Sequence, residues 1–232
     1  SAVTTGDRNT LVGRNSGDAI TTGAANVALG YEALGANTTA NSNTAIGSFS
    51  LDANTTGADN TAVGSTSLGT NTTGDSNVAV GVAALTANTA SNKNTAIGGA
   101  SLSSFNVTTD TDTFNTAVGY GSGQSLTTGQ SNTLIGALAG DALTTANSNV
   151  AVGGSALTAD TLGARSVAIG QGTLGLQNFT TATNAYNVAV GYAAGDHITT
   201  GIFNTLIGGL AGDSLSDADF NVAIGQGALT DD

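Results

Sequence analysis

Histidine occurs once in this sequence, so a Ser–His–Asp triad or a histidine metal site would have to be built around that residue. His197 lies in a Gly-Asp-His-Ile turn at residues 195–198, and the matching turn at residues 140–143 reads Gly-Asp-Ala-Leu. Because alanine serves at the same place in that copy, we interpret His197 as a structural residue. The sequence therefore predicts a chain that is not an enzyme.

Aspartate follows glycine at four related places, and carboxylate oxygens are the ligands that Ca²⁺ takes in proteins. These residues are Asp18, Asp141, Asp196 and Asp213. The Gly-Gly-x-Gly-x-Asp nonapeptide of calcium rolls is absent from the sequence. We therefore interpret the row as a solvated acidic corner and expect no bound metal.

One glycine-rich segment, residues 170–175, matches the G-x-G-x-x-G of dinucleotide-binding loops. In those loops the segment opens a helix, whereas here the next repeat of the chain interrupts it. We expect no nucleotide and no other cofactor.

Asparagine and threonine recur in patterns that can carry modification or ice binding. The glycosylation sequon occurs at Asn37, Asn54, Asn71, Asn106 and Asn178. Three of these belong to a repeated Asn-Thr-Thr turn, which we interpret as turn chemistry. Ice-binding arrays need threonines at alternating positions, but here they are adjacent and would splay apart in a strand. We expect neither function.

The composition limits the kind of core that the chain can build. Glycine occurs 34 times, only 9% of the residues are charged and 4% aromatic, and Pro, Met, Trp and Cys are absent. A core of this composition must be thin and lined by small aliphatic side chains. The net charge of −12 opposes nucleic-acid binding, and no apolar run is long enough to insert into a membrane. Because Met is absent, we expect a processed product or an internal piece of a longer chain.

A five-residue word, N-[TV]-[AL]-[VIL]-G, recurs thirteen times, with serine in place of asparagine in one copy. The copies begin at Asn9, Asn26, Asn43, Asn60, Asn77, Asn94, Asn115, Asn132, Asn149, Ser166, Asn187, Asn204 and Asn221. Successive words start 17 residues apart except for two steps of 21, in the coils that begin at residues 94 and 166. A fixed period of this kind is the signature of a solenoid.

Each word predicts a short β-strand, because its middle residues are apolar on both faces. The glycine ends the strand at a tight corner, and the asparagine can form an amide ladder with its copies above and below. We therefore predict an all-β, parallel β-solenoid of about thirteen 17-residue coils, forming one repeat domain over residues 1–232 with four-residue insertions in the coils that start at 94 and 166.

The core anchor alternates between two kinds of coil. In most coils a leucine lies eight residues after the first residue of the word: Leu34, Leu51, Leu68, Leu85, Leu102, Leu157, Leu174 and Leu229. In the others that place is glycine, and the anchor lies three residues further on, at Ile20, Leu126, Leu143, Ile198 and Leu215. Each coil thus keeps one large aliphatic residue for a thin core.

Alanine holds the third position of most words, including Ala28, Ala45, Ala62, Ala79, Ala96, Ala117 and Ala151. If Val and Ile of positions two and four line the inside of each roll, this stripe faces outward. A stripe of that length is an unusual apolar patch for a monomer, so we predict that it faces the axis of a homotrimer. Replacing Ala62 by Glu would then bury like charges together and abolish assembly.

The words NTAIG, NVAVG and SVAIG, each followed by an Ala-Leu or Ala-Gly step, resemble the head repeats of YadA-like trimeric autotransporter adhesins. They resemble still more closely the N-T-A-[IV]-G…N-T-T-G repeats in the shafts of phage tail fibres and related bacterial surface proteins. The resemblance covers essentially all 232 residues. It implies parallel β-rolls wound as homotrimers, outside the cell or on a virion.

On this resemblance we expect a structural fibre shaft of a phage or virus-like appendage that presents a receptor-binding tip. The alternative is a bacterial cell-surface trimeric adhesin whose rod binds host matrix or glycan. The expected partners are further copies of the chain, other fibre or tail proteins, and a host-surface glycan or receptor.

The residue before the word becomes aromatic late in the chain, at Phe114, Tyr186, Phe203 and Phe220. The last three lie in consecutive coils, so their rings can stack as a ladder that offers a platform for sugars or for another fibre component. Phe114 and Tyr186 directly follow the two insertions. We therefore favour a second role, in which the rings seal the widened coils against an adjacent chain.

Overall fold

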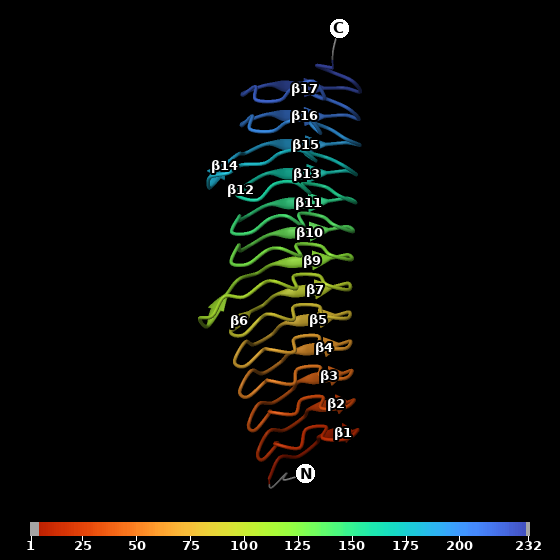
Figure 1. The fold of residues 1–232 in the computed structure, drawn as a ribbon, viewed down its shortest axis with the longest axis vertical. Helices are drawn as coiled ribbons and strands as arrows, with labels where there is room; N and C mark the ends of the chain where they lie inside the picture. The colour runs from red at the N-terminus through yellow and green to blue at the C-terminus, as the bar shows by residue number, and fades with distance from the viewer. Residues whose placement is uncertain (1–4, 231–232) are drawn as a thin grey trace. The chain divides into compact units, whose positions relative to one another are not determined.

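The computed structural model describes residues 5–230 and is a parallel β-solenoid of about thirteen coils at about 17-residue spacing, which confirms the predicted fold class. Thirteen three-residue strands, one from each word, alternate with tight turns (Figure 1). No helix occurs in the described part of the chain, and so none there is long and apolar enough to cross a membrane.

The coils fall into two compact units, which divide after Phe114. Unit 1 contains β1 (Thr10–Val12), β2 (Val27–Leu29), β3 (Thr44–Ile46), β4 (Thr61–Val63), β5 (Val78–Val80) and β7 (Thr95–Ile97). Unit 2 contains β9 (Thr116–Val118), β10 (Thr133–Ile135), β11 (Val150–Val152), β13 (Val167–Ile169), β15 (Val188–Val190), β16 (Thr205–Ile207) and β17 (Val222–Ile224). The expectation of one repeat domain stays a prediction, and its ends, residues 1–4 and 231–232, lie outside the described residues.

Within each unit, neighbouring strands pair in parallel and in register, so that equal positions of the word lie side by side. In unit 1, for example, Ala45 pairs with Ala62, which pairs in turn with Ala79. In unit 2, Ala151 pairs with Ala168 in the same way, although the word begins with Asn149 in one coil and with Ser166 in the next. Residues at the same position of successive coils therefore form columns along the stack, and the members of one column share similar surroundings.

Glycine is required at the last position of each word for two physical reasons. Its φ lies between 124° and 146° in all thirteen copies, a region that residues with a Cβ rarely adopt. A Cβ built on Gly64 would also lie 2.5 Å from the carbonyl oxygen of Gly81 in the next coil. Backbone conformation and the close approach of stacked coils thus both require this residue.

The alanine stripe lies inside the coil, and this contradicts the predicted orientation. Seven alanines have no solvent-accessible surface in the single chain: Ala28, Ala45, Ala62, Ala79, Ala96, Ala117 and Ala151. Positions two and four point outward instead, with Ile97 38% and Ile207 41% exposed. Alanine holds position three in every coil that has leucine at position nine, and leucine takes position three only at Leu11, Leu134 and Leu206, where position nine is glycine.

The anchors occupy the interior as expected in most coils. Leu68 is fully buried at φ 49°, and the equivalent leucines are also left-handed. That conformation costs about 1–2 kcal/mol, which burying a leucine side chain at about 1.5–3 kcal/mol offsets. In the other coils glycine makes room: a Cβ on Gly140 would lie 2.8 Å from side-chain atoms of both Leu134 and Leu143. Leu229, in the last coil, is 49% exposed.

The predicted asparagine ladder is confirmed, and it carries hydrogen bonds between successive coils. The backbone N–H of Asn77 donates to Oδ1 of Asn60 at 2.9 Å, and Asn60 donates likewise to Asn43 at 3.0 Å. Asn60 Nδ2 also donates to the carbonyl of Gly74 at 2.8 Å. These asparagines are fully buried, so each satisfies a backbone group that water cannot reach.

A second column of buried asparagines runs through unit 1 at position twelve of the coil: Asn37, Asn54, Asn71 and Asn88. Asn71 Nδ2 donates to Asn54 Oδ1 at 2.9 Å and to the carbonyl of Gly74 at 3.0 Å. The Gly74 carbonyl therefore accepts from both columns. The Asn-Thr-Thr pattern at Asn37, Asn54 and Asn71 predicts a turn, and it does not indicate this buried column.

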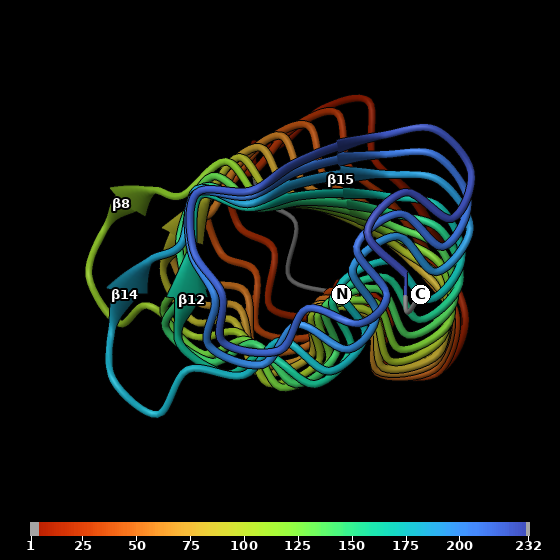
Figure 2. The same cartoon turned by 90° about the horizontal axis from the view of Figure 1, so that it is seen from above.

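The two insertions leave the stack as projecting loops, each held by a short parallel pair. Strand β6 (Ser91–Asn92) pairs with β8 (Thr111–Asp112) in unit 1, and β12 (Gly163–Ala164) with β14 (Thr183–Asn184) in unit 2. Figure 2 shows the loops bearing β8 and β14 outside the main outline of the coils. Phe105 is fully buried and Phe179 is 5% exposed, so these two rings fill the widened coils from inside.

Candidate interaction surface

The outer face of each strand carries most of the exposed large apolar side chains of the described residues. We define the outer strand face as four columns: the residue before the word, positions two and four of the word, and the residue after the corner glycine. Position four is apolar in every coil: Val12, Leu29, Ile46, Val63, Val80, Ile97, Val118, Ile135, Val152, Ile169, Val190, Ile207 and Ile224. None of these side chains is buried in the single chain.

Aromatic rings widen this face at the end of unit 2. The Tyr186 and Phe203 rings stack with centroids 5.4 Å apart and planes 11° apart, and those of Phe203 and Phe220 with centroids 5.0 Å apart and planes 6° apart. Phe203 is 41% and Phe220 73% exposed in the single chain. All three have positive φ, a conformation that bulky residues adopt only at a cost.

Stacking decides which part of each ring is accessible. A sugar packs against the face of an aromatic ring, but in this ladder the two faces of Phe203 are occupied by its neighbours. The ladder therefore offers ring edges to solvent, together with the outer face of Phe220. Edges suit packing against aliphatic side chains better than they suit glycan stacking. Whether the rings seal a contact with another chain stays a prediction.

Three of the chain's four cations lie over an aromatic ring of the next coil. Arg14 lies 5.8 Å from the Tyr31 centroid, and Lys93 lies 5.5 Å from that of Phe114. Arg165 lies 5.5 Å from the Tyr186 centroid and also donates a hydrogen bond to its hydroxyl. Each contact joins residues of one column, which places cations and rings together at the edges of the outer strand face.

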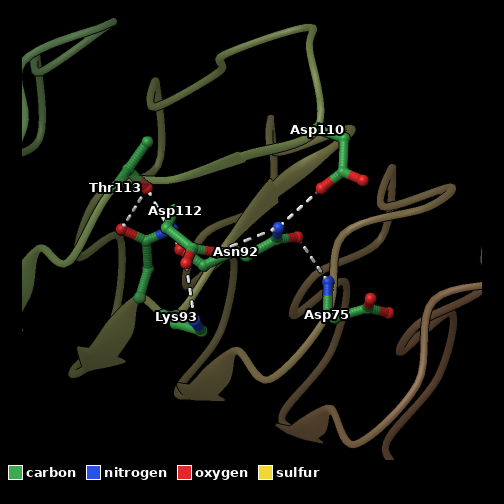
Figure 3. Close-up of polar contacts among 7 residues, drawn as sticks. Asp75, Asn92, Lys93, Asp110, Asp112 and Thr113 are labelled. Carbon is green, nitrogen blue, oxygen red and sulfur yellow. Dashed lines mark hydrogen bonds and ion pairs between the residues drawn. The ribbon is translucent and has the colours of Figure 1, made fainter.

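The first insertion forms a closed polar cluster beside this face (Figure 3). Asn92 Nδ2 donates to Oδ1 of Asp110 at 2.7 Å and of Asp112 at 3.3 Å, while Asn92 Oδ1 accepts the backbone N–H of Asp75 at 2.8 Å. Lys93 Nζ lies 2.5 Å from Asp112 Oδ2 and lowers the pKa of that carboxyl. The contacts are internal, so the cluster holds the loop in place.

His197 belongs to a small exposed cluster at the corner of unit 2. Its Nδ1 lies 2.9 Å from Asp213 Oδ1, and Asp196 offers an oxygen within 4.8 Å of both residues. The hydrogen bond with Asp213, and then its charge, raise the pKa of His197. The Asp–His contact is a solvent-exposed ion pair when the histidine is protonated, with Asp196 close enough for the three to offer metal ligands.

The other acidic residues at this corner have different contacts in the two units. In unit 1, Asp18, Glu32 and Asp52 line a shallow hollow, and burial, followed by the charges of the other two, raises the pKa of Asp52. In unit 2, Asp141 accepts a hydrogen bond from the Thr158 hydroxyl at 2.6 Å. The predicted row therefore does not form one continuous set of equivalent carboxylates.

Buried polar side chains near the second insertion replace the asparagine ladder where it is interrupted. Ser166 is too short to continue it, and the Gln177 side chain contacts Asp160 Oδ2 at 2.6 Å, the Ser166 hydroxyl at 3.2 Å and Asn187 Nδ2 at 2.8 Å. Asp160 Oδ1 accepts the backbone N–H of Gly163 at 2.9 Å. Burial raises the pKa of Asp160 in spite of these hydrogen bonds. No repeated pattern in the sequence predicts this network.

The remaining sequence candidates lie in turns. The sequon residues Asn37, Asn54 and Asn71 are buried in the second asparagine column, whereas Asn106 and Asn178 lie in the insertion coils and are at least partly exposed. The segment 170–175 is a turn that directly follows strand β13 within its coil. Hydroxyls of several first threonines donate to the backbone of the next coil, as Thr55 does to Thr72 at 3.0 Å, so they do not form a free second rank.

The chain matches no protein-family model, and no curated protein or solved structure is significantly similar to it.

Proposed function

We propose that this chain is a structural shaft, one strand of a homotrimeric fibre of a phage or virus-like appendage outside the cell. The observation that carries the proposal is the use of the coil interior. Buried asparagine columns hydrogen-bond successive coils, and in the described residues every buried side-chain nitrogen and oxygen has a partner. Such an interior stiffens the stack and leaves no buried reactive group free for chemistry.

The expected role in holding a receptor-binding tip rests on the resemblance to tail-fibre shafts. The adhesin alternative requires the rod itself to hold a glycan or a matrix protein. The stacked rings of unit 2 support that alternative poorly, because their faces pack against one another. We therefore favour the shaft over the adhesin.

The test is the mass and protease resistance of the purified chain. Light scattering after size exclusion should give three times 22.3 kDa, about 67 kDa. A non-specific protease should cut first within the insertion loops, near residues 106–112 and 178–184, because the other turns are held by bonds between coils. A monomer that is degraded evenly through its corners would contradict the proposal.

A further inference from the structure

We propose that the outer strand face is the surface by which copies of this chain associate, with a second copy of the chain as its occupant. The inference rests on the proposed shaft. In it the outer strand face, and not the alanine stripe, forms the contact between copies. Its starting point is the uncovered side of the sheet: purely parallel sheets are normally covered on both faces. Here the inner face packs on the coil interior, and the outer face is open in both units.

The chemistry of the face is that of an interface core. Positions two and four contain only Thr, Val, Leu and Ile, and Val82, Tyr120 and Tyr192 extend the surface after the corner glycine, each more than 60% exposed. Aromatic and aliphatic side chains without charge are typical of the centre of a protein interface.

Charge favours a second copy over another partner. Sixteen acidic residues give the chain its charge of −12, yet only Asp59 falls in the four columns of the outer strand face. The four cations Arg8, Arg14, Lys93 and Arg165 all fall in them, at the margins of the strand. Two strongly acidic copies can therefore approach through this face with only Asp59 of each copy as an opposing carboxylate.

The area of the outer strand face and the spacing of its side chains also favour a second copy of the chain as its occupant. With strands about 4.8 Å apart and residues about 3.3 Å apart, the outer strand face of one unit covers roughly 600–700 Å². Stable complexes bury about 800 Å² on each partner, so one unit alone approaches that size. A parallel copy also presents the same side chains at the same axial spacing, so its ridges match along the whole row.

The ladder formed by Tyr186, Phe203 and Phe220 lies in the column before the word, beside positions two and four of the same strands. Its outward ring edges add apolar width where a second copy would pack. The residue before the word is left-handed in all thirteen coils, including Ala25 and Ser42, so the repeat sets this conformation and the rings only add apolar surface to it.

The experiment places a charge on the face in each unit and measures self-association of the full chain by sedimentation. Ile97→Asp combined with Ile207→Asp should weaken association about tenfold or more, because buried contacts would acquire unpaired carboxylates. The matched control is Thr56→Asp with Thr128→Asp, which adds the same charge at exposed turn positions away from the face. The control should associate as tightly as wild type.

Two further readouts keep the inference separable from folding and from the shaft. If the aspartate pair does not fold, Ile97→Thr with Ile207→Thr, which keeps the β-branched shape, should still weaken association by several fold. If wild type associates and both face variants match it, the outer strand face is not the contact, although the shaft proposal stands. If wild type stays monomeric at the highest soluble concentration, both proposals fall.

Discussion

Asn60→Ala removes one step of the buried asparagine ladder and leaves the rest of the coil intact. The change deletes the acceptor for the buried backbone N–H of Asn77 and one of two donors to the Gly74 carbonyl. An orphaned buried donor costs about 1–3 kcal/mol, and losing one satisfied hydrogen bond about 0.5–1.5 kcal/mol. We expect a local loss of about 2–4 kcal/mol, since Asn71 still donates to Gly74.

The assay is hydrogen exchange followed by mass spectrometry, because a stack of repeats need not unfold in one step. A loss of about 2–4 kcal/mol should speed exchange in peptides that cover residues 77–81 by roughly 30- to 1,000-fold when exchange proceeds by local opening. The matched control is Asn41→Ala, an exposed asparagine whose side-chain oxygen accepts the Ala24 N–H. We expect that control to change exchange by less than about fivefold.

The double variant Asn60→Ala and Asn71→Ala gives a sharper test of the two columns. It removes both side-chain donors to Gly74, so its cost should exceed the sum of the single variants by about 1 kcal/mol or more. Additive costs would show that the shared carbonyl does not couple the columns. Equal exchange in Asn60→Ala and Asn41→Ala would refute the ladder's role altogether.

Three further predictions concern a corner glycine, the alanine stripe and the buried carboxyl of Asp160. Gly64→Ala should lower the melting temperature by many degrees, since its Cβ would meet a carbonyl of the next coil, whereas Gly154→Ala, with open space around it and an ordinary φ, should change it little. Ala62→Glu should unfold the chain itself, as seen by circular dichroism at concentrations where wild type is monomeric, because Ala62 is fully buried. Burial raises the pKa of Asp160 above that of the unfolded chain, so the folded state binds the proton more tightly and gains stability as pH falls from neutral through the raised pKa towards 3.8. Asp160→Asn should lack that gain in denaturant titrations compared between pH 7 and about pH 4, near the ordinary pKa, and an unchanged difference between the two pH values would contradict this.

The sequence predicts the number of coils, the in-register stack, the corner glycines and the first asparagine ladder, because each has a fixed place in the 17-residue period. The apolar alternation of the word does not by itself say which side of the strand faces inward. The word alternates between two apolar sets, and that pattern is satisfied equally well with either set inside. Burial in the structure settles the question in favour of alanine.

One signal for the correct orientation was present in the sequence. Leucine replaces alanine at position three only in coils whose ninth position is glycine, as in the pairs Leu11 with Gly17 and Leu206 with Gly212. In the structure a Cβ on Gly17 would lie 2.6 Å from a Leu11 methyl carbon. A gain of volume at one position matched by a loss at the other indicates that both face the same interior.

The buried Phe105 ring and the polar network around Gln177, both in the insertion coils, are harder to predict. Phe105 takes the position that asparagine holds in earlier coils, and Gln177 takes the same position in the coil whose word begins with serine. Each is a single departure from the period, so no repetition marks its partners. Only the three-dimensional neighbours reveal that Gln177 compensates for Ser166.

The second insertion lengthens its coil without moving the strand that follows. Strands β13 and β15 are separated by 21 residues in sequence, yet Val167 still pairs with Val188 and Ile169 with Val190, as in coils of ordinary length. The added residues extend sideways through β14 instead of along the stack. Within this unit the axial rise is thus counted in coils and not in residues, and loops at this corner can vary in length and chemistry while the spacing of the strands stays constant.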